Sequence, residues 1–287
     1  MPLTGTGRIV TAASKDGRGV GAFNVIQLEH AQAIVAGAEA AGAPVVLQLS
    51  ENAVRYHGGL GAIGAAVLAV AESARVPVAV HLDHATSAEL VHQAVELGFP
   101  SVMFDASVLP YGENVRTTAE VVAHCHDAGV WVEAELGEVG GKDGVHAPGA
   151  RTDPAEAAAF TAATGVDALA VAVGTSHAML TRDAALDFEL IGALRAAVPV
   201  PLVLHGSSGV ADADLTAAVE HGVTKVNIAT HLNRVLTIAV REALTGDPHL
   251  VDTRRYLGAG RSAVAAEVTR LLDVLRAPRR GGSVHTF

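Results

Sequence analysis

The stretch Val80-His81-Leu82-Asp83-His84 closes a short apolar run over Val76–Leu82, and a segment with helical spacing, Ala88–Leu97, follows it. Short β-branched runs alternate with longer Ala-rich segments in this way along the chain. The predicted strands are Gly21–Val25, Pro44–Leu49, Val76–Leu82, Ser101–Phe104, Val130–Leu136, Ala168–Val173, Val200–Leu204 and Lys225–Ile228. The predicted helices are Leu28–Ala41, Ala62–Arg75, Ala88–Leu97, Glu113–Ala128, Pro154–Thr164, Phe188–Ala197 and Ala211–His221, with an additional C-terminal helix over Ser262–Leu275.

Eight strand-helix units in this order decide the fold class. Parallel strands need helical crossovers, so the pattern predicts an α/β protein, a (β/α)8 TIM barrel with an additional C-terminal helix. An open doubly wound sheet is the alternative, but eight near-equal units favour closure. No linker or second domain is visible, so we expect residues 1–287 to form a single domain.

Composition excludes several classes of function. Half of the 287 residues are hydrophobic and 17% are charged, which argues against disorder. A net charge of −10 disfavours binding to nucleic acid or to an anionic membrane. Cys125 is the only cysteine and cannot form an intrachain disulfide, and no N-terminal targeting pattern is visible. We therefore expect a cytoplasmic protein.

Polar residues end nearly every predicted strand, where barrels of this class carry their active sites. These residues are Asn24, Ser50, Asp83 with His84, Asp105 with Ser107, Glu133 with Glu135, Ser176 with His177, His205 with Gly206, and Asn227. Each one alone is better explained as a helix cap, but this explanation is weaker for the histidines, which are poor caps. Three imidazoles, from His84, His177 and His205, suit zinc or another first-row divalent ion. Such a cation polarises a substrate carbonyl.

Two further features adjoin this predicted metal site. Asp83 is placed as a general acid/base for the substrate, and His81 is either a support for the site or a plain core residue. The runs His205-Gly206-Ser207-Ser208-Gly209 and Asn227-Ile228-Ala229-Thr230, the second just before a helix, predict a phosphate site, with a flexible loop as the alternative. A long Gly-rich stretch from Gly137 to about Thr152 is a candidate functional loop.

The ordered set of segments resembles the class II, metal-dependent ketose-bisphosphate aldolases, which include the fructose-bisphosphate and tagatose-bisphosphate enzymes. The similarity extends from Gly21 to the segment Asp252–Leu257. It is carried by Gly21-Ala22-Phe23-Asn24-Val25, His81-Leu82-Asp83-His84, Ser101-Val102-Met103-Phe104-Asp105, Val132-Glu133-Ala134-Glu135-Leu136-Gly137, Gly174-Thr175-Ser176-His177, Leu204-His205-Gly206 and Lys225-Val226-Asn227-Ile228.

The resemblance implies reversible aldol cleavage of a phosphorylated ketose to dihydroxyacetone phosphate and an aldehyde. It implies that His84, His177 and His205 hold Zn2+, or another divalent ion such as Co2+ or Mn2+, with Glu135 as an alternative ligand or a neighbour of the ligands. Asp83 then exchanges the proton of the C4 hydroxyl, while the metal stabilises the enediolate.

The resemblance also implies how the substrate is bound. By the family pattern, Asn227 hydrogen-bonds the enediolate, and the phosphate is held by Gly206, Ser208 and Thr230. Asn24 and Ser50 correspond to positions near the aldehyde half, and Arg254 or Arg255 to an arginine that reaches the distal phosphate. The family further suggests a monovalent cation, Na+ or K+, and a homodimer or homotetramer.

Several residues depart from the family pattern, and they cluster around phosphate and proton handling. They are Ala178, Leu180 and Thr181 after the second histidine, Ser207 after the third, Ala106 after the fourth strand, and the loop Gly140-Gly141-Lys142-Asp143-Gly144. A glutamate thought to assist proton transfer is either missing or replaced by Asp143, and Arg182 is a candidate substitute for a lost lysine. The metal chemistry is therefore expected to be intact. The expected substrate is fructose 1,6-bisphosphate or a tagatose 1,6-bisphosphate-like ketose, and the alternative is a different or monophosphorylated ketose.

Three other classes of protein compete with this interpretation. A Schiff-base aldolase needs a reactive lysine, but the only lysines are Lys15, Lys142 and Lys225, and Lys225 begins its strand at the end away from the site. A sugar isomerase or amidohydrolase explains the histidines but not the ordered segments. A non-catalytic relative is disfavoured because Asp83 and the three histidines are all present.

Overall fold

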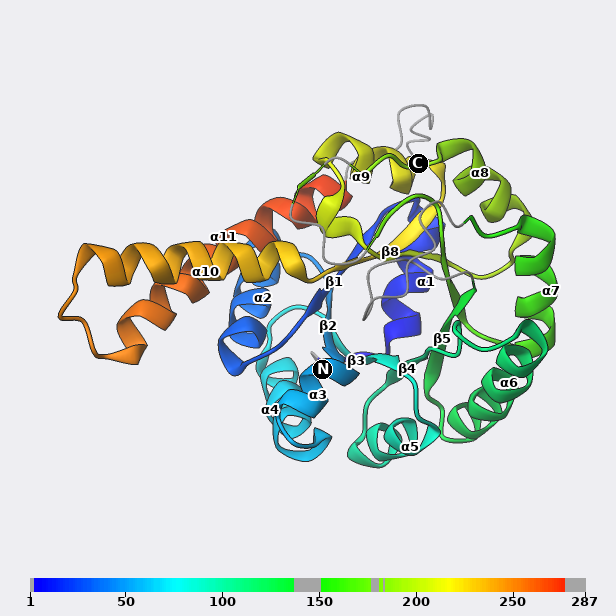
Figure 1. The fold of residues 1–287 in the computed structure, drawn as a ribbon, viewed down its shortest axis with the longest axis horizontal. Helices are drawn as coiled ribbons and strands as arrows, with labels where there is room; N and C mark the ends of the chain where they lie inside the picture. Colours follow the sequence, from blue (N-terminus) through cyan, green and yellow to red (C-terminus); the bar gives the residue numbers. More distant parts are fainter. Residues whose placement is uncertain (1–2, 137–150, 177–180, 183, 277–287) are drawn as a thin grey trace, which may run out of the picture.

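The computed structural model describes residues 3–136, 151–176, 181–182 and 184–276. Eight parallel strands follow one another around a closed barrel, in which the last strand pairs with the first (Figure 1). The strands are β1 (Val20–Asn24), β2 (Val45–Ser50), β3 (Val78–Ala85), β4 (Ser101–Phe104), β5 (Trp131–Leu136), β6 (Ala168–Val171), β7 (Leu202–Leu204) and β8 (Val223–Ile228). The predicted barrel is confirmed, and the alternative of an open sheet is wrong.

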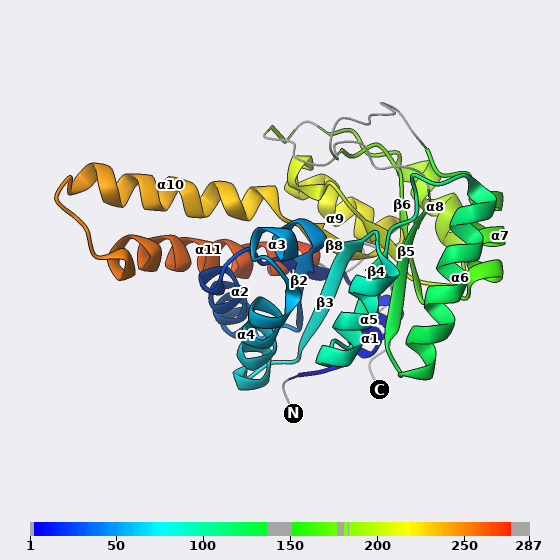
Figure 2. The ribbon, with the colours of Figure 1, turned by 60° about the horizontal axis from the view of Figure 1, so that its bottom comes forward.

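Helices surround the barrel and follow the strands in alternation (Figures 1 and 2). They are α1 (Thr6–Asp16), α2 (Leu28–Ala41), α3 (Glu51–Tyr56), α4 (Leu60–Ser73), α5 (Ala88–Leu97), α6 (Tyr111–Asp127), α7 (Pro154–Thr164), α8 (Phe188–Ala197), α9 (Asp212–His221), α10 (Thr230–Gly246) and α11 (Thr253–Leu275), with a 3-10 turn η1 (Ser207–Gly209). The boundaries of α2, α5, α7 and α8 agree with the prediction. Helices α1 and α3 were not predicted.

The C-terminal helix is longer than the sequence indicated. It begins at Thr253 rather than Ser262, because the Asp252 side chain caps it by accepting a hydrogen bond from the Arg254 backbone N–H at 3.0 Å. Gly260 lies inside this helix, where a Cβ atom would be 3.1 Å from Leu236 Cγ of α10. This glycine allows α10 and α11 to approach closely and does not break the helix.

The strands separate two kinds of interior. Residues on their outer face, such as Val80 and Leu82, are fully buried against the surrounding helices in one large apolar cluster. Inside the barrel, a small apolar layer that includes Ala22, Val46 and Ala79 packs against Ile9 of α1. Helix α1 therefore closes the N-terminal end of the barrel, which leaves the other end for polar residues.

Helices α10 and α11 form an antiparallel hairpin whose far end projects from the barrel (Figures 1 and 2). The C-terminal part of α11 packs on α2, where a Cβ atom on Gly37 would lie 2.5 Å from the Ala265 carbonyl oxygen. Its buried residues include Val268 and Leu272. Among the described residues, no helix combines the length and apolar character that crossing a membrane requires.

Candidate metal and proton-transfer site

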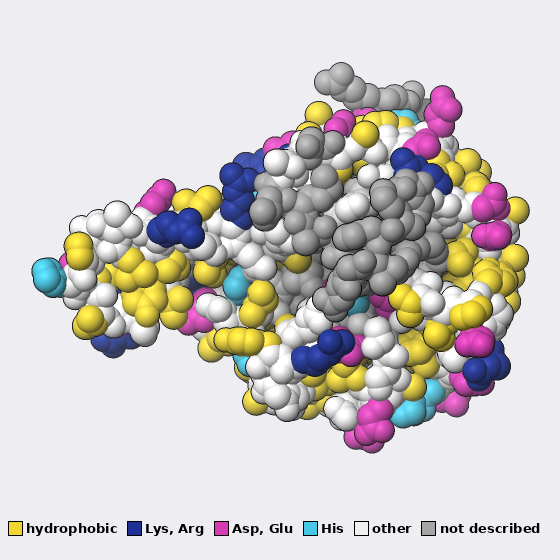
Figure 3. Space-filling model, viewed as in Figure 1, with side chains coloured by type: hydrophobic (Ala, Val, Ile, Leu, Met, Phe, Trp, Pro, Cys, Tyr) yellow, Lys and Arg dark blue, Asp and Glu magenta, His cyan; other side chains and the backbone are white. Residues whose placement is uncertain are grey.

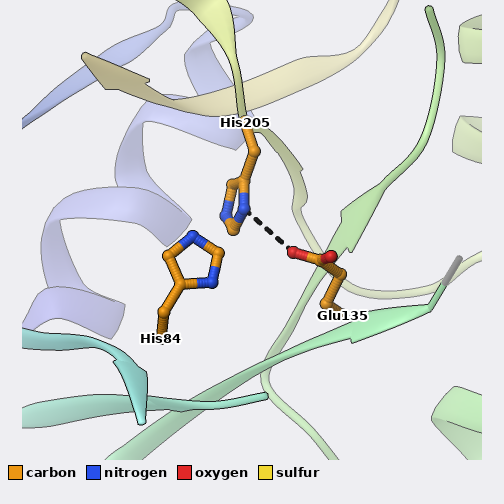
Figure 4. A group of neighbouring side chains, drawn as sticks. All are labelled: His84, Glu135 and His205. Carbon is orange, nitrogen blue, oxygen red and sulfur yellow. Dashed lines mark ion pairs between the residues drawn. The ribbon is translucent and has the colours of Figure 1, made fainter. Parts of the chain in front are cut away.

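Two of the predicted histidines and one predicted glutamate lie together at the C-terminal end of the barrel. His84 near the end of β3, Glu135 in β5 and His205 directly after β7 each offer one ligand atom within 4.8 Å of the other two. Their side chains point toward one another (Figure 4), and the rings of His84 and His205 have centroids 4.7 Å apart. Two imidazoles and a carboxylate suit zinc or a related divalent ion.

A β-bulge brings adjacent residues of β3 into the same site. Between Leu82 and Ala85, β3 has one residue more than the paired stretch of β4, and His84 has a φ of 51°. Among the described non-glycine residues, it alone has a positive φ, a conformation that costs on the order of 1–3 kcal/mol. Successive strand residues normally face opposite sides, but the bulge turns His84 inward beside Asp83.

Asp105 determines how the ring of His84 is oriented. The Asp105 Oδ2 atom lies 2.9 Å from His84 Nδ1, and its Oδ1 atom accepts hydrogen bonds from the Ser107 backbone N–H at 3.2 Å and hydroxyl at 2.7 Å. An ionised carboxylate only accepts, so Nδ1 of the ring carries the proton. Nε2 then carries the lone pair that a metal ion would bind.

Two carboxylates hold the ring of His205 between them. Glu133 Oε1 lies 2.9 Å from Nε2, and Glu135 Oε2 lies 3.1 Å from Nδ1. Burial alone lowers the pKa of His205, but the hydrogen bonds to Glu133 and Glu135 outweigh it and raise the pKa to about 9. Since Nε2 donates to Glu133, Nδ1 is the atom that faces Glu135 and can bind a metal ion after loss of its proton.

Asp83 is a buried carboxylate fixed by two amides. Its Oδ2 atom accepts a hydrogen bond from Asn24 Nδ2 at 2.8 Å, and its Oδ1 atom accepts one from Asn227 Nδ2 at 3.4 Å. Burial raises its pKa, but the charges of His84, Lys225 and His205 have the larger effect and lower the pKa to about 2. The side chain is therefore held ionised and can accept a proton beside the metal donors.

A second polar layer lies under these residues, and sequence reasoning missed the part that Lys225 has in it. Lys225 is the third residue of β8, and its Nζ atom lies 2.8 Å from Glu133 Oε2 and 2.7 Å from Asn227 Oδ1. The expectation that Lys225 begins its strand is wrong, because β8 begins two residues earlier, at Val223. The sequence did contain a signal, because residues two apart in a strand share a face. This spacing relates Lys225 to Asn227 and Glu133 to Glu135.

His81 lies in the same layer and is neutral. Burial and the charge of Lys225 lower its pKa to about 3. Its Nδ1 atom is 2.8 Å from Ser101 Oγ, and its Nε2 atom is 3.8 Å from Glu133 Oε2. His81 therefore borders the residue that holds His205 and does not reach the metal donors.

The residues predicted to bind phosphate lie around the start of α10. Gly206 has a φ of 65°, and a Cβ atom there would be 2.6 Å from the Ser176 carbonyl oxygen, so only glycine fits. Ser208 Oγ accepts a hydrogen bond from the His231 backbone N–H at 3.1 Å, next to Thr230 at the first position of the helix. The two predicted runs therefore meet, at a helix N-terminus that favours anions.

Ser50 and the arginines have other contacts in the structure. Ser50 caps α3 by accepting a hydrogen bond from the Ala53 backbone N–H at 3.2 Å. Arg182 is bound to Asp212. Arg254 and Arg255 are in the first turn of α11, which begins at the projecting end of the hairpin (Figure 1). Arg254 pairs with Asp252 at 2.8 Å. In this chain the two arginines are not brought to the metal donors.

Several predicted residues lie outside the described part of the chain. They are His177, Ala178, Leu180, Gly140, Gly141, Lys142 and Asp143. Their roles stay predictions.

Solved structures of aldolases share this architecture. The YdjI aldolase of Escherichia coli K12 matches with a TM-score of 0.82 at 33% identity, over 95% of this chain and 97% of that one. A putative fructose-1,6-bisphosphate aldolase from Coccidioides immitis matches with a TM-score of 0.81 at 30% identity, over 93% of this chain and 94% of that one.

Curated sequences agree with the structural neighbours. A probable fructose-bisphosphate aldolase of Bacillus subtilis is 42% identical over 272 residues, which cover 93% of this chain and 95% of that protein. The fructose-bisphosphate aldolase of Geobacillus stearothermophilus is 41% identical over the same shares. The profile of the family described as fructose-bisphosphate aldolase class-II matches residues 4–280. This chain therefore belongs to the class II fructose-bisphosphate aldolase family.

Proposed function

We propose that the protein reversibly cleaves a phosphorylated ketose to dihydroxyacetone phosphate and an aldehyde, with a divalent metal ion, in the manner of its family. The observation that carries this proposal is the position of Asp83. Its ionised carboxylate lies beside the converging donors His84, Glu135 and His205. A proton acceptor next to a metal site is the combination that aldol cleavage needs.

The proposed metal is Zn2+, with Co2+ or Mn2+ as alternatives, held by His84, His205 and the predicted ligand His177. Glu135 is close enough to be a further ligand or to accept a hydrogen bond from one. The bound cation supplies polarisation of the substrate carbonyl, which stabilises the negative charge that develops during cleavage. A monovalent cation, Na+ or K+, is proposed from the family alone.

The chain's own residues then divide the remaining work. Asp83 takes the proton of the C4 hydroxyl, with its carboxylate oriented by the amides of Asn24 and Asn227. Asn227 Nδ2 points toward Asp83 and is placed to donate to the enediolate oxygen as well. Gly206, Ser208 and Thr230 bind the phosphate through the start of α10.

A metal-removal experiment tests the reaction type. Aldol cleavage should disappear after chelation and return when zinc is restored, and borohydride should trap no imine with the substrate. Cleavage that survives chelation, together with a trapped imine, would establish the Schiff-base mechanism instead.

For the substrate we propose a class of phosphorylated ketoses rather than one sugar. Fructose 1,6-bisphosphate and tagatose 1,6-bisphosphate are the family's substrates, while Thr181, Ser207 and the predicted loop residue Asp143 depart from its pattern. Arg182 is bound to Asp212 at 2.5 Å, which opposes its role as a substitute phosphate ligand. Cleavage rates on a panel of mono- and bisphosphorylated ketoses decide which class is used.

We also propose a homodimer or homotetramer that functions in the cytoplasm. The projecting hairpin exposes apolar side chains, among them Ile238, Leu244 and Val251 at 41%, 39% and 88% (Figure 3). A second copy would cover them and bring Arg254 and Arg255 toward another chain. Ile238→Glu with Leu244→Glu should reduce the mass measured by light scattering. The exposed Val108 precedes α6, which lies on the opposite side of the barrel (Figure 1), so Val108→Glu should not change the mass.

A further inference from the structure

Lys225 is fully buried inside the barrel, so no substrate could reach it there. A buried ammonium group is costly unless it is paired, and Glu133 pairs with it at 2.8 Å. This ion pair lies at the centre of the polar layer.

The lysine determines the orientation of the Asn227 amide. An ammonium group has three donors and no acceptor, so the Asn227 atom that lies 2.7 Å from Nζ must be the oxygen Oδ1. The amide nitrogen then faces Asp83 Oδ1, at 3.4 Å. A flipped amide would place an NH2 group against the ammonium and an oxygen against the carboxylate, so both contacts would become repulsive.

The same lysine also reaches the metal side of the site through Glu133. One oxygen of Glu133 lies 2.8 Å from Lys225 Nζ in an ion pair, and the other lies 2.9 Å from His205 Nε2. That contact determines which nitrogen of His205 faces Glu135. A continuous chain of contacts thus joins Asp83, Asn227, Lys225, Glu133 and His205, with the lysine at its middle.

We infer that Lys225 is a positioning residue, which fixes the Asn227 amide directly and the His205 ring through Glu133. It thereby holds the metal donor His205 and the proton acceptor Asp83 in a fixed relative position. This inference rests on the proposed function. The competing explanation is that Lys225 only neutralises the charge of Glu133. The two explanations predict different activities for a variant in which the charges of Lys225 and Glu133 are both removed.

The test compares Lys225→Met with the double variant Lys225→Met/Glu133→Gln. The single variant leaves a buried carboxylate uncompensated and should be strongly destabilised. The double variant removes both charges, while the glutamine can still accept from His205, so it should fold. We expect its kcat to fall about a hundredfold with little change in KM, because Asn227 is no longer fixed. Lys15→Met, an exposed lysine of α1, is the matched control and should be unchanged.

Two further measurements separate positioning from charge balance. Zinc affinity, measured by competition with a chelator, should be about tenfold to a hundredfold weaker in the double variant, because His205 is less well held. In an Asn227→Ala background, loss of the lysine should lower kcat little further, since both changes remove the same interaction.

Several outcomes would overturn the inference. They are wild-type kcat and zinc affinity in the folded double variant, or losses that are fully additive with Asn227→Ala. If the double variant does not fold, Lys225→Arg keeps the charge but moves the donor atoms, and wild-type kcat there would likewise overturn it. Absence of aldol cleavage in the wild type would instead reject the proposed function, while the zinc measurement would still decide the role of Lys225.

Discussion

The two faces of the barrel strands differ in kind although their residues alternate along the same segments. In β3, Val80 and Leu82 face the helices in an apolar layer, whereas His81 and Asp83 face the interior in a network of hydrogen bonds. An apolar layer tolerates exchange of similar volumes, but a buried polar network needs a partner for every group. Changes on the outer face should therefore affect stability, and changes on the inner face should affect chemistry.

The largest expected effect comes from the inner face. Asp83→Ala should lower the rate of ketose cleavage about a hundred- to ten-thousandfold, because it removes the proton acceptor. Zinc content should be retained, since the donors His84, Glu135 and His205 remain. Steady-state kinetics and metal analysis of one preparation check both statements, and near wild-type turnover would show that another group moves the proton.

The adjacent residue on the outer face should behave in the opposite way. Leu82 is fully buried, so Leu82→Ala should lower the free energy of unfolding by about 2–5 kcal/mol, measured in urea. Its kcat per folded molecule should stay close to the wild-type value. A fall in kcat as large as that of Asp83→Ala would mean that the two faces are not separable.

A pH titration sharpens the comparison further. The folded pKa of Asp83, about 2, is below its ordinary value of 3.8, so the ionised carboxylate stabilises the fold above pH 4. This stabilisation, about 2 kcal/mol, should be lost as the pH falls from about 4 through about 2. Unfolding of metal-free protein should show this loss in the wild type, and Asp83→Asn should lack it. Parallel pH curves for the two would contradict the assignment.

The smallest effect is expected at the edge of the site. Ser50 caps α3, and Ser50→Ala should cost about 1 kcal/mol of stability. Thermal unfolding and the KM for the ketose distinguish its two roles. A raised KM with unchanged unfolding would show that Ser50 contacts the substrate rather than the helix.

Most of the fold was predictable because periodicity is local. The runs and helical segments gave the eight strands and most helices, but α1 and α3 were missed. Helix α3 has only 6 residues, and α1 has neither a side-chain cap nor an acidic residue in its first turn. Gly260 lies inside the longer C-terminal helix, and its tertiary contact with α10 could not be predicted from the sequence either.

The site was predictable only as a set of residue types. The strand-end rule found Asp83, His84 and His205, but the bulge that turns His84 inward depends on pairing with β4. The role of Lys225 was missed because its position in the strand was misjudged by two residues. Hydrogen-bond partners from distant strands determine these orientations, so local patterns could not supply them.

Zinc binding compared between the wild type and His205→Ala decides whether His205 Nδ1 binds the metal. We expect zinc in the wild type, cleavage that follows its removal and return, and at least about a hundredfold weaker binding in the variant. Full zinc occupancy in His205→Ala, with cleavage unchanged by chelation of the wild type, would contradict this expectation.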